Sequence, residues 1–155
     1  MNHNPDWYNI SLKVILKNQP GQVLILKNAE GTGEAGWHDI PGGRINVDEF
    51  TTPYEELIDR EIKEEIGENV KYTISLDPVS FGRHWYDSER QKKLIKVFYI
   101  VFEGKYVSGD IVVSKEHLDF AWVNLEKLSL VKYFQKGMLE VMQRYLSLKN
   151  KERQR

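Results

Sequence analysis

The feature that most constrains this chain is the segment Arg60–Gly67, which reads Arg-Glu-Ile-Lys-Glu-Glu-Ile-Gly. Residues three and four positions apart are neighbours on a helix, so Glu61, Glu64 and Glu65 share a face, where like charges repel by a few tenths of a kcal/mol per pair, roughly. Clustered carboxylates suit Mg²⁺ or Mn²⁺, and Mg²⁺ usually bridges protein carboxylates to substrate phosphates. Taken alone, such a run is more typical of a solvated surface on which Arg60 pairs with neighbouring glutamates.

The flanking residues predict a well-bounded helix and favour the functional interpretation. Thr52 stands where an N-cap is expected, Pro53 at the first helical position and Glu55 at the third, which together form a capping box. Gly67 can turn the chain out of the helix in the left-handed conformation. Isoleucines four residues apart predict a stripe that packs on a sheet; they are Ile58, Ile62 and Ile66. The carboxylates should then lie at the rim of the core, where a cleft can form.

Gly42 and Gly43, ahead of the helix, allow the backbone to approach a ligand or ion closely. Gly43-x5-Glu49 followed by Arg60-Glu61-Ile62-x-Glu64-Glu65-x-Gly67 resembles the signature of the Nudix hydrolases, and Trp37–Ile45 is similar to that family's W-x-x-(L/I)-P-G-G-(R/K)-(I/V) lead-in. The resemblance covers roughly residues 37–67. Together the two matches make the solvated-surface interpretation the weaker one.

Two departures from the family pattern alter what can be expected. Ten residues rather than seven separate Glu49 from Arg60. We interpret this as a three-residue insertion at residues 50–52, in a loop, where insertions cost little. The helix register is then preserved, whereas the position of Glu49 relative to the metal stays open. Glu68 replaces an aliphatic residue of the pattern, and Val70 is expected to take over its packing role.

The resemblance implies an α/β (α+β) fold, an α/β/α sandwich around a mixed sheet, with one domain over residues 1–155. It implies Mg²⁺- or Mn²⁺-dependent hydrolysis of a pyrophosphate bond in a nucleoside diphosphate linked to another group, such as a nucleoside triphosphate or a dinucleoside polyphosphate. The implied metal ligands are Glu61, Glu64, Glu65 and the carbonyl of Gly42. Arg60 would orient Glu61 by a charge-assisted hydrogen bond; a surface ion pair is the alternative.

A further carboxylate is expected from a later segment, as ligand or general base. Glu116 is the first candidate, because residues 115–122 resemble the E-H-x-x-(Y/F)-x-W segment of some family members. Asp119 and Glu103 are the alternatives, and His117 is predicted to be structural. For substrate binding the candidates are Tyr8, Trp37, Arg44 and Arg83, with Phe81, Trp85, Tyr86, His84, Arg90, Lys92 and Lys93 as further possibilities. Aromatic side chains can stack on a base, although core packing or a solvated charged surface is the commoner role.

Two other functional classes are compatible with the fold. A Nudix-fold module that binds a nucleotide without cleaving it should lack some of the metal glutamates, and none is missing here. An isomerase of the isopentenyl diphosphate type would require a catalytic cysteine, and the chain contains no cysteine. The sequence therefore favours the hydrolase.

Composition and the terminal sequence limit the kinds of partner and the cellular location that we expect. The 155 residues carry a net charge of −1, which does not favour a nucleic-acid partner. The N-terminus lacks the pattern of a signal peptide, and no apolar run approaches the ~20 residues needed to cross a bilayer. We therefore expect a cytoplasmic enzyme that acts on a small nucleotide, without a membrane association. The sequence is compatible with a homodimer and does not decide the oligomeric state.

The remaining chain alternates between strand and turn patterns. Residues 8–16 alternate in polarity and predict a half-buried strand, which a turn at 18–21 connects to a second strand at 22–27. A glycine-rich loop is expected at 28–36. Further strands are predicted at 70–76, 79–83, 93–103 and 120–123, with a charged connection at 87–92. Helical spacing of apolar residues predicts one amphipathic helix over about 130–148.

Overall fold

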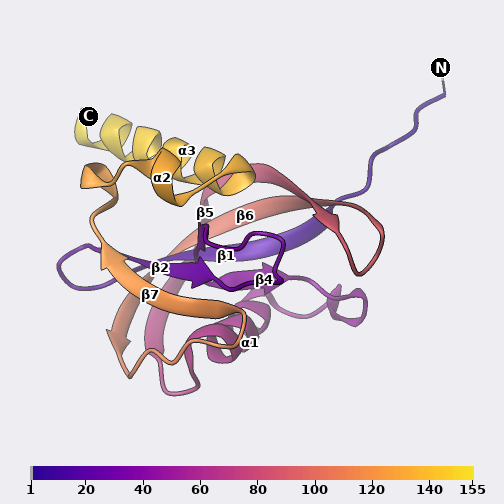
Figure 1. Ribbon diagram of the computed structural model, residues 1–155. Coiled ribbons are helices and arrows are strands. Elements are labelled where there is room, and N and C mark those ends of the chain that lie inside the picture. Colours follow the sequence, from indigo (N-terminus) through magenta and orange to yellow (C-terminus); the bar gives the residue numbers. More distant parts are fainter. Residues whose placement is uncertain (1) are drawn as a thin grey trace.

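The structure, a computed structural model, describes residues 2–155 and contains one mixed sheet with helices on both sides (Figure 1). In chain order the elements are β1 (Asn9–Lys17), β2 (Val23–Asn28), β3 (His38–Asp39), β4 (Gly42–Arg44), the 3₁₀ turn η1 (Val47–Glu49), α1 (Tyr54–Ile66), β5 (Lys71–Ser88), β6 (Lys93–Ser108), β7 (His117–Val123), the 3₁₀ turn η2 (Leu125–Lys127), α2 (Leu130–Tyr133) and α3 (Lys136–Arg153). The strand order is β3-β2-β1-β6-β5, with β4 paired to β1 and β7 paired to β2. Within residues 2–155, β1 and β6 run parallel and the remaining strand pairs are antiparallel.

The central strand β1 is buried on both faces, not on one as its alternation predicted. Its residues 11–16 are all buried. Ile15 packs in the cluster beneath α3, whereas Val14 packs with Ile58 and Ile62 in the cluster beneath α1. Helices α1 and α3 therefore cover opposite faces of the sheet, as Figure 1 shows. This arrangement is the predicted α/β/α sandwich.

Helix α1 begins one residue later than predicted. Its first helical hydrogen bond runs from the Leu57 N–H to the Pro53 carbonyl at 3.2 Å, so Pro53, not Thr52, is the N-cap, and no side chain caps it. Proline is compatible with this position, because its carbonyl accepts the first helical bond and its missing N–H is not needed there. Residues 50–52 form a turn between η1 and the helix. The predicted insertion therefore ends before α1 and leaves the register of its glutamates intact.

Three strands are longer than predicted. The two pieces expected at 70–83 belong to one strand, β5, in which the register shifts between Ser75 and Ser80. This strand continues to Ser88, and β6 continues to Ser108. β7 begins at His117, three residues before the predicted start. Long cross-strand pairing between β5 and β6 extends both strands beyond the segments that show clear alternation.

The predicted C-terminal helix is two helices. The chain leaves the helical conformation at Phe134 and Gln135, and Lys136 has a φ of 48°. At Gly137, an added Cβ would lie 2.5 Å from the Arg83 carbonyl oxygen. This close approach of α3 to β5 fixes where α3 starts, so the chain turns before it. Val131, predicted on the apolar stripe, is 60% exposed on α2.

Among residues 2–155, no helix combines the length and apolar character required to span a bilayer.

Candidate active site

A cleft of about 880 Å³ lies where the C-terminal half of α1 meets β4, β1 and the segment before β7. Its size suits a small-molecule ligand. The lining contains nine of the predicted site residues, namely Gly42, Arg44, Arg60, Glu61, Glu64, Glu65 and Glu116, with His84 and Tyr86 from the further substrate-binding possibilities. The other residues of the lining are Ser11, Lys13, Asn28, Thr32, Glu34, Asp39, Gly43, Asn46, Val97, Tyr99, Ser114, Lys115 and His117.

The three glutamates of α1 have different surroundings. Glu65 is buried, and its Oε2 accepts a hydrogen bond of 2.7 Å from the Gly42 N–H. Glu61 packs against Gly43 so closely that any Cβ at that position would collide with its carboxylate. Glu64 is directed to the open side of the cleft, with 59% of its side chain exposed. The double glycine thus allows β4 to lie directly on the carboxylate face of α1.

Arg60 connects the glutamates to η1. Its Nη1 donates to Glu61 Oε1 at 2.7 Å and lies 3.3 Å from Glu64 Oε2. On its other side, Nη2 donates to Glu49 Oε2 at 3.0 Å, and Nε lies 2.8 Å from Glu49 Oε1. Glu49, whose position was open because of the insertion, therefore holds Arg60 in a two-pronged pair. The Asn46 N–H in turn donates to Glu49 at 2.8 Å.

The electrostatics of the carboxylate cluster favour a bound cation. Burial raises the pKa of Glu61, and the negative charges of Glu65 and Glu64 raise it further, while Arg60 opposes the shift. Carboxylate oxygens are the ligands that Mg²⁺ and Mn²⁺ prefer. A divalent ion would relieve this repulsion, so the residues present fit the metal that the family resemblance implies.

Lys13 is a member of the site that the sequence did not indicate. Its ammonium group donates to Asp39 Oδ2 and to the Gly42 carbonyl, both at 2.8 Å, and to the Ile40 carbonyl at 3.3 Å. Burial lowers the pKa of Lys13, but the charges of Asp39, Glu65 and Glu61 outweigh burial and raise it overall. The Gly42 carbonyl, predicted as a metal ligand, is therefore hydrogen-bonded to a buried cation.

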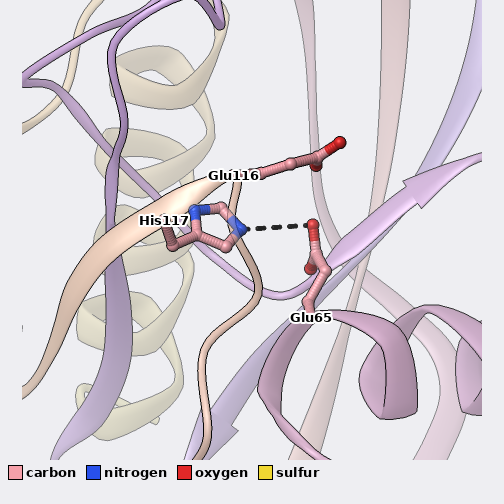
Figure 2. Close-up of side chains that lie close together, drawn as sticks. All are labelled: Glu65, Glu116 and His117. Atoms are coloured by element: carbon pink, nitrogen blue, oxygen red, sulfur yellow. Dashed lines mark hydrogen bonds and ion pairs between the residues drawn. The ribbon is translucent and has the colours of Figure 1, made fainter.

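Glu116 and His117, at the start of β7, lie close to Glu65 of α1 across the cleft. Ligand atoms of these three residues lie within 4.8 Å of one another. Figure 2 shows the side chains of Glu116, just before β7, and of His117, the first residue of β7, beside Glu65 of α1. His117 Nε2 lies 3.4 Å from Glu65 Oε1. The backbone fixes this segment, because the Ala29 N–H donates to the Glu116 carbonyl at 2.9 Å and the Ser114 N–H donates to the Glu65 carbonyl at 3.0 Å.

A further part of the cleft lining, on β5, is organised around His84. Its Nδ1 accepts a hydrogen bond of 3.2 Å from the Gly137 N–H, so the ring hydrogen lies on Nε2, which donates to Glu34 Oε1 at 3.2 Å. Gln135 also donates to Glu34. The glycine-rich loop is thereby tied to β5 and to the start of α3. Glu34 was not indicated by any motif, because the contacts that place it come from distant segments.

Of the other substrate-binding candidates, His84 and Tyr86 line the cleft. The candidates outside its lining are Tyr8, Trp37, Phe81, Arg83, Trp85, Arg90, Lys92 and Lys93. Tyr8 packs edge-on against Phe98, Trp37 is half-buried outside the lining, and Arg83 is exposed on β5. Alternation along β5 explains the last case, since His84 and Tyr86 face the cleft and residues 83 and 85 do not. The alternative bases are also outside it: Glu103 binds Tyr145 of α3, and Asp119 binds the Phe120 N–H. Arg44 lines the cleft and donates to the Tyr86 hydroxyl at 3.1 Å.

Comparison with known proteins agrees with this geometry. Residues 7–145 match the family model of the NUDIX domain. The nucleoside triphosphatase NudI of Escherichia coli O81 (strain ED1a) is 30% identical over 112 residues, which cover 70% of this chain and 77% of NudI. The MutT protein from Methanosarcina mazei Go1 is 29% identical, with a TM-score of 0.71 over 94% of this chain and 95% of that one.

The fold is shared more widely. A C. elegans Ap4A hydrolase superposes with a TM-score of 0.61 at 18% identity, covering 92% of this chain and 98% of that one. The match of the family model spans most of the chain, and the glutamates of its signature meet in the cleft. The chain therefore belongs to the Nudix family and is a Nudix hydrolase, a pyrophosphohydrolase that acts on phosphorus-containing anhydrides.

Proposed function

We propose that this enzyme hydrolyses a pyrophosphate bond in a nucleoside diphosphate linked to another group, with Mg²⁺ or Mn²⁺ as its cofactor. The observation that carries the proposal is the convergence of four carboxylates, from α1 and from the segment before β7, on one side of a cleft that also contains Arg44, Arg60 and Lys13. Acidic groups that bind cations and basic groups that meet phosphates are both required for this reaction.

The metal is assigned to the glutamates of α1. Glu61, Glu64 and Glu65 would hold it, with Glu61 oriented by Arg60 and Glu65 oriented by the Gly42 N–H. Gly42 thus supports the site through its N–H, while its carbonyl is bound to Lys13. When bound, a divalent ion would neutralise charge on the diphosphate and lower the pKa of an attacking water.

Glu116 is assigned as the general base. Its carboxylate is exposed to the cleft and faces Glu65 from another segment of the chain, so it can accept a proton from water outside the glutamate cluster on α1. Arg44 is the residue best placed to meet the substrate, because it is exposed at the mouth. Tyr8, Trp37 and Arg83 are given no role in this proposal.

Nucleoside triphosphates are the first substrates to test, since NudI is named as a nucleoside triphosphatase. Dinucleoside polyphosphates and nucleoside diphosphate sugars complete the panel. The purified chain should hydrolyse at least one of them in Mg²⁺ or Mn²⁺, lose activity in EDTA and regain it when the metal is restored. Full activity in EDTA would contradict the metal-dependent mechanism.

Variants separate the proposed roles. Glu64→Gln should lower kcat by at least ~100-fold, the scale of losses at metal sites. Glu116→Gln should lower kcat with little change in KM, as expected for an interaction made mainly in the transition state. Glu56→Gln is the matched control, because Glu56 is exposed on the same helix but lies outside the cleft. Nucleotide binding without hydrolysis by the wild-type enzyme would favour the binding-module alternative.

A further inference from the structure

The part of the cleft floor that lies beyond Lys13 contains the hydroxyl groups of two largely buried residues, Ser11 and Tyr99. Ser11 is 2% exposed and Tyr99 is 7% exposed, yet both line the cleft. Within residues 2–155, neither side-chain hydroxyl forms a hydrogen bond to another residue, although each is accessible from the cleft. Hydroxyls that are open to the cleft and unpaired within the protein are free to bind water or a ligand there.

Ser11 and Tyr99 are neighbours in the sheet because of the strand register. Ser11 of β1 is paired with Tyr99 of the parallel strand β6, and on its other side with Arg44 of β4. The Tyr99 ring is stacked on His84, with ring centroids 5.5 Å apart, and Val97 supplies an apolar surface beside it. The floor therefore offers two hydrogen-bonding groups next to flat and apolar surfaces.

The position of this floor relative to the glutamates is set by the same strand. The β1–β4 pairing joins Ser11 to Arg44, and Lys13, two residues on, to Gly42. At about 3.3 Å per residue, the two pairs are ~7 Å apart along the strand. Gly42 and Gly43 contact Glu65 and Glu61. A ligand whose phosphates lie at the glutamates would thus extend toward Ser11 and Tyr99 by roughly the width of a sugar.

We propose that Ser11 and Tyr99 form the subsite that recognises the nucleobase of the substrate, by hydrogen bonds from their hydroxyls to the polar edge of the ring. This inference rests on the proposed nucleotide substrate and assigns residues that determine its base specificity. A hydroxyl can donate and accept, and a planar heterocycle presents both kinds of group. Burial raises the pKa of the Tyr99 phenol well above its ordinary value, so the group keeps its hydrogen at neutral pH.

The test uses ligands that bind without turnover. We would measure Kd for α,β-imido analogues of nucleoside triphosphates with different bases, and for inorganic tripolyphosphate, which has no base. Ser11→Ala and Tyr99→Phe should each weaken the preferred nucleotide by about 3- to 10-fold, the value of one hydrogen bond. The differences among bases should shrink, and tripolyphosphate affinity should stay within about 2-fold of wild type.

Matched variants remove a hydroxyl from β6, the strand of Tyr99, and from the adjacent strand β5 without touching the cleft. The Tyr106 hydroxyl binds the Gly109 carbonyl, and the Ser80 hydroxyl binds the Val141 carbonyl at 2.8 Å. Tyr106→Phe and Ser80→Ala should lower Tm and leave base preference unchanged. Ser11→Ala and Tyr99→Phe should show the reverse, an unchanged or higher Tm with altered preference, because their hydroxyls have no protein partner to lose.

Three outcomes would overturn the subsite. One is unchanged base preference in both cleft variants; another is equal weakening of nucleotides and tripolyphosphate. The third is a wild-type protein that binds the nucleotides no better than tripolyphosphate. The proposed hydrolysis is judged separately, because it fails when none of the natural nucleotides is cleaved, whatever the affinities of the imido analogues.

Discussion

At the scale of single residues, Lys13 holds the loop before β4 against β1. Its ammonium group has three acceptors, and only 6% of the side chain is exposed. We predict that Lys13→Met lowers the free energy of unfolding by about 3 kcal/mol or more, because it leaves the Asp39 carboxylate and two carbonyls without their cation. Urea denaturation with a shared m value would measure this change.

Lys17 on the same strand provides the control. Its ammonium group lies 3.7 Å from Glu103, and 30% of the side chain is exposed. Such a pair contributes less than ~1 kcal/mol, so Lys17→Met should have a small effect. Equal losses in the two variants would contradict the role assigned to Lys13.

The glutamates and Lys13 differ in how well a sequence can reveal them. Glu61, Glu64 and Glu65 were predicted together because helical spacing is local, and the structure brings all three to the cleft. Lys13 stands between apolar residues in a strand, where alternation places it on a solvated face. Only the closure of β4 over β1, which brings Gly42 opposite Lys13, buries it. The pairing of Glu49 with Arg60 depends likewise on the path of the inserted loop.

At the scale of elements, a substitution at the start of α1 tests whether Pro53 rather than Thr52 is the N-cap. Because Thr52 caps nothing in the structure, Thr52→Ala should change the free energy of unfolding by less than ~0.5 kcal/mol. Asn124→Ala is the comparison, since the Asn124 side chain accepts a 3.0 Å hydrogen bond from the Glu126 N–H at the start of η2. That variant should lose about 0.5–1 kcal/mol. If chemical denaturation showed a larger loss of unfolding free energy for Thr52→Ala than for Asn124→Ala, Thr52 would be the N-cap, as the sequence predicted.

The close packing of α3 against β5 gives a second prediction at this scale. Gly137→Ala would place a Cβ 2.5 Å from the Arg83 carbonyl oxygen and 2.6 Å from His84 Cβ. Overpacking of this kind costs about 1–3 kcal/mol, more than the gain of up to ~1 kcal/mol from alanine in a helix. The variant should therefore have a lower Tm.

Ser147→Ala, on the exposed face of α3, has the helical gain without the clash, so its Tm should be unchanged or higher. A stabilised Gly137→Ala would show that α3 does not sit as closely on β5 as described. The break before α3 was not predictable from apolar spacing, because spacing reports which face is buried and not how near the backbone of another element lies.

At the scale of the whole molecule, the topology depends on contacts that no local pattern encodes. Parallel pairing of β1 with β6 joins Asn9 to Val97, and strand alternation alone cannot specify this partner. The mixed sheet was expected only because the motif resembles the Nudix signature. Once formed, this pairing aligns Ser11 with Tyr99, so the specificity proposed for the cleft is also a consequence of long-range topology.

The same long-range contacts attach α3 to the rest of the molecule through two carboxylates. Glu34 accepts hydrogen bonds from His84 and Gln135, near the start of α3. Glu103 accepts one from the Tyr145 hydroxyl, and the ammonium group of Lys149 lies 3.2 Å away. Burial raises the pKa of each carboxyl, but these donors outweigh burial and lower both pKa values below the ordinary 4.5.

A carboxyl with a lowered pKa binds its proton less readily in the folded state than in the unfolded state. Its contribution to stability is therefore complete above pH 4.5 and is lost as the pH falls through the folded-state pKa. We predict that the free energy of unfolding falls steeply below pH 4.5. Glu103→Gln should be less stable than wild type at pH 7 and approach wild type in acid. Equal pH slopes for the two proteins in urea denaturation would show that Glu103 does not stabilise the docking of α3 through its charge.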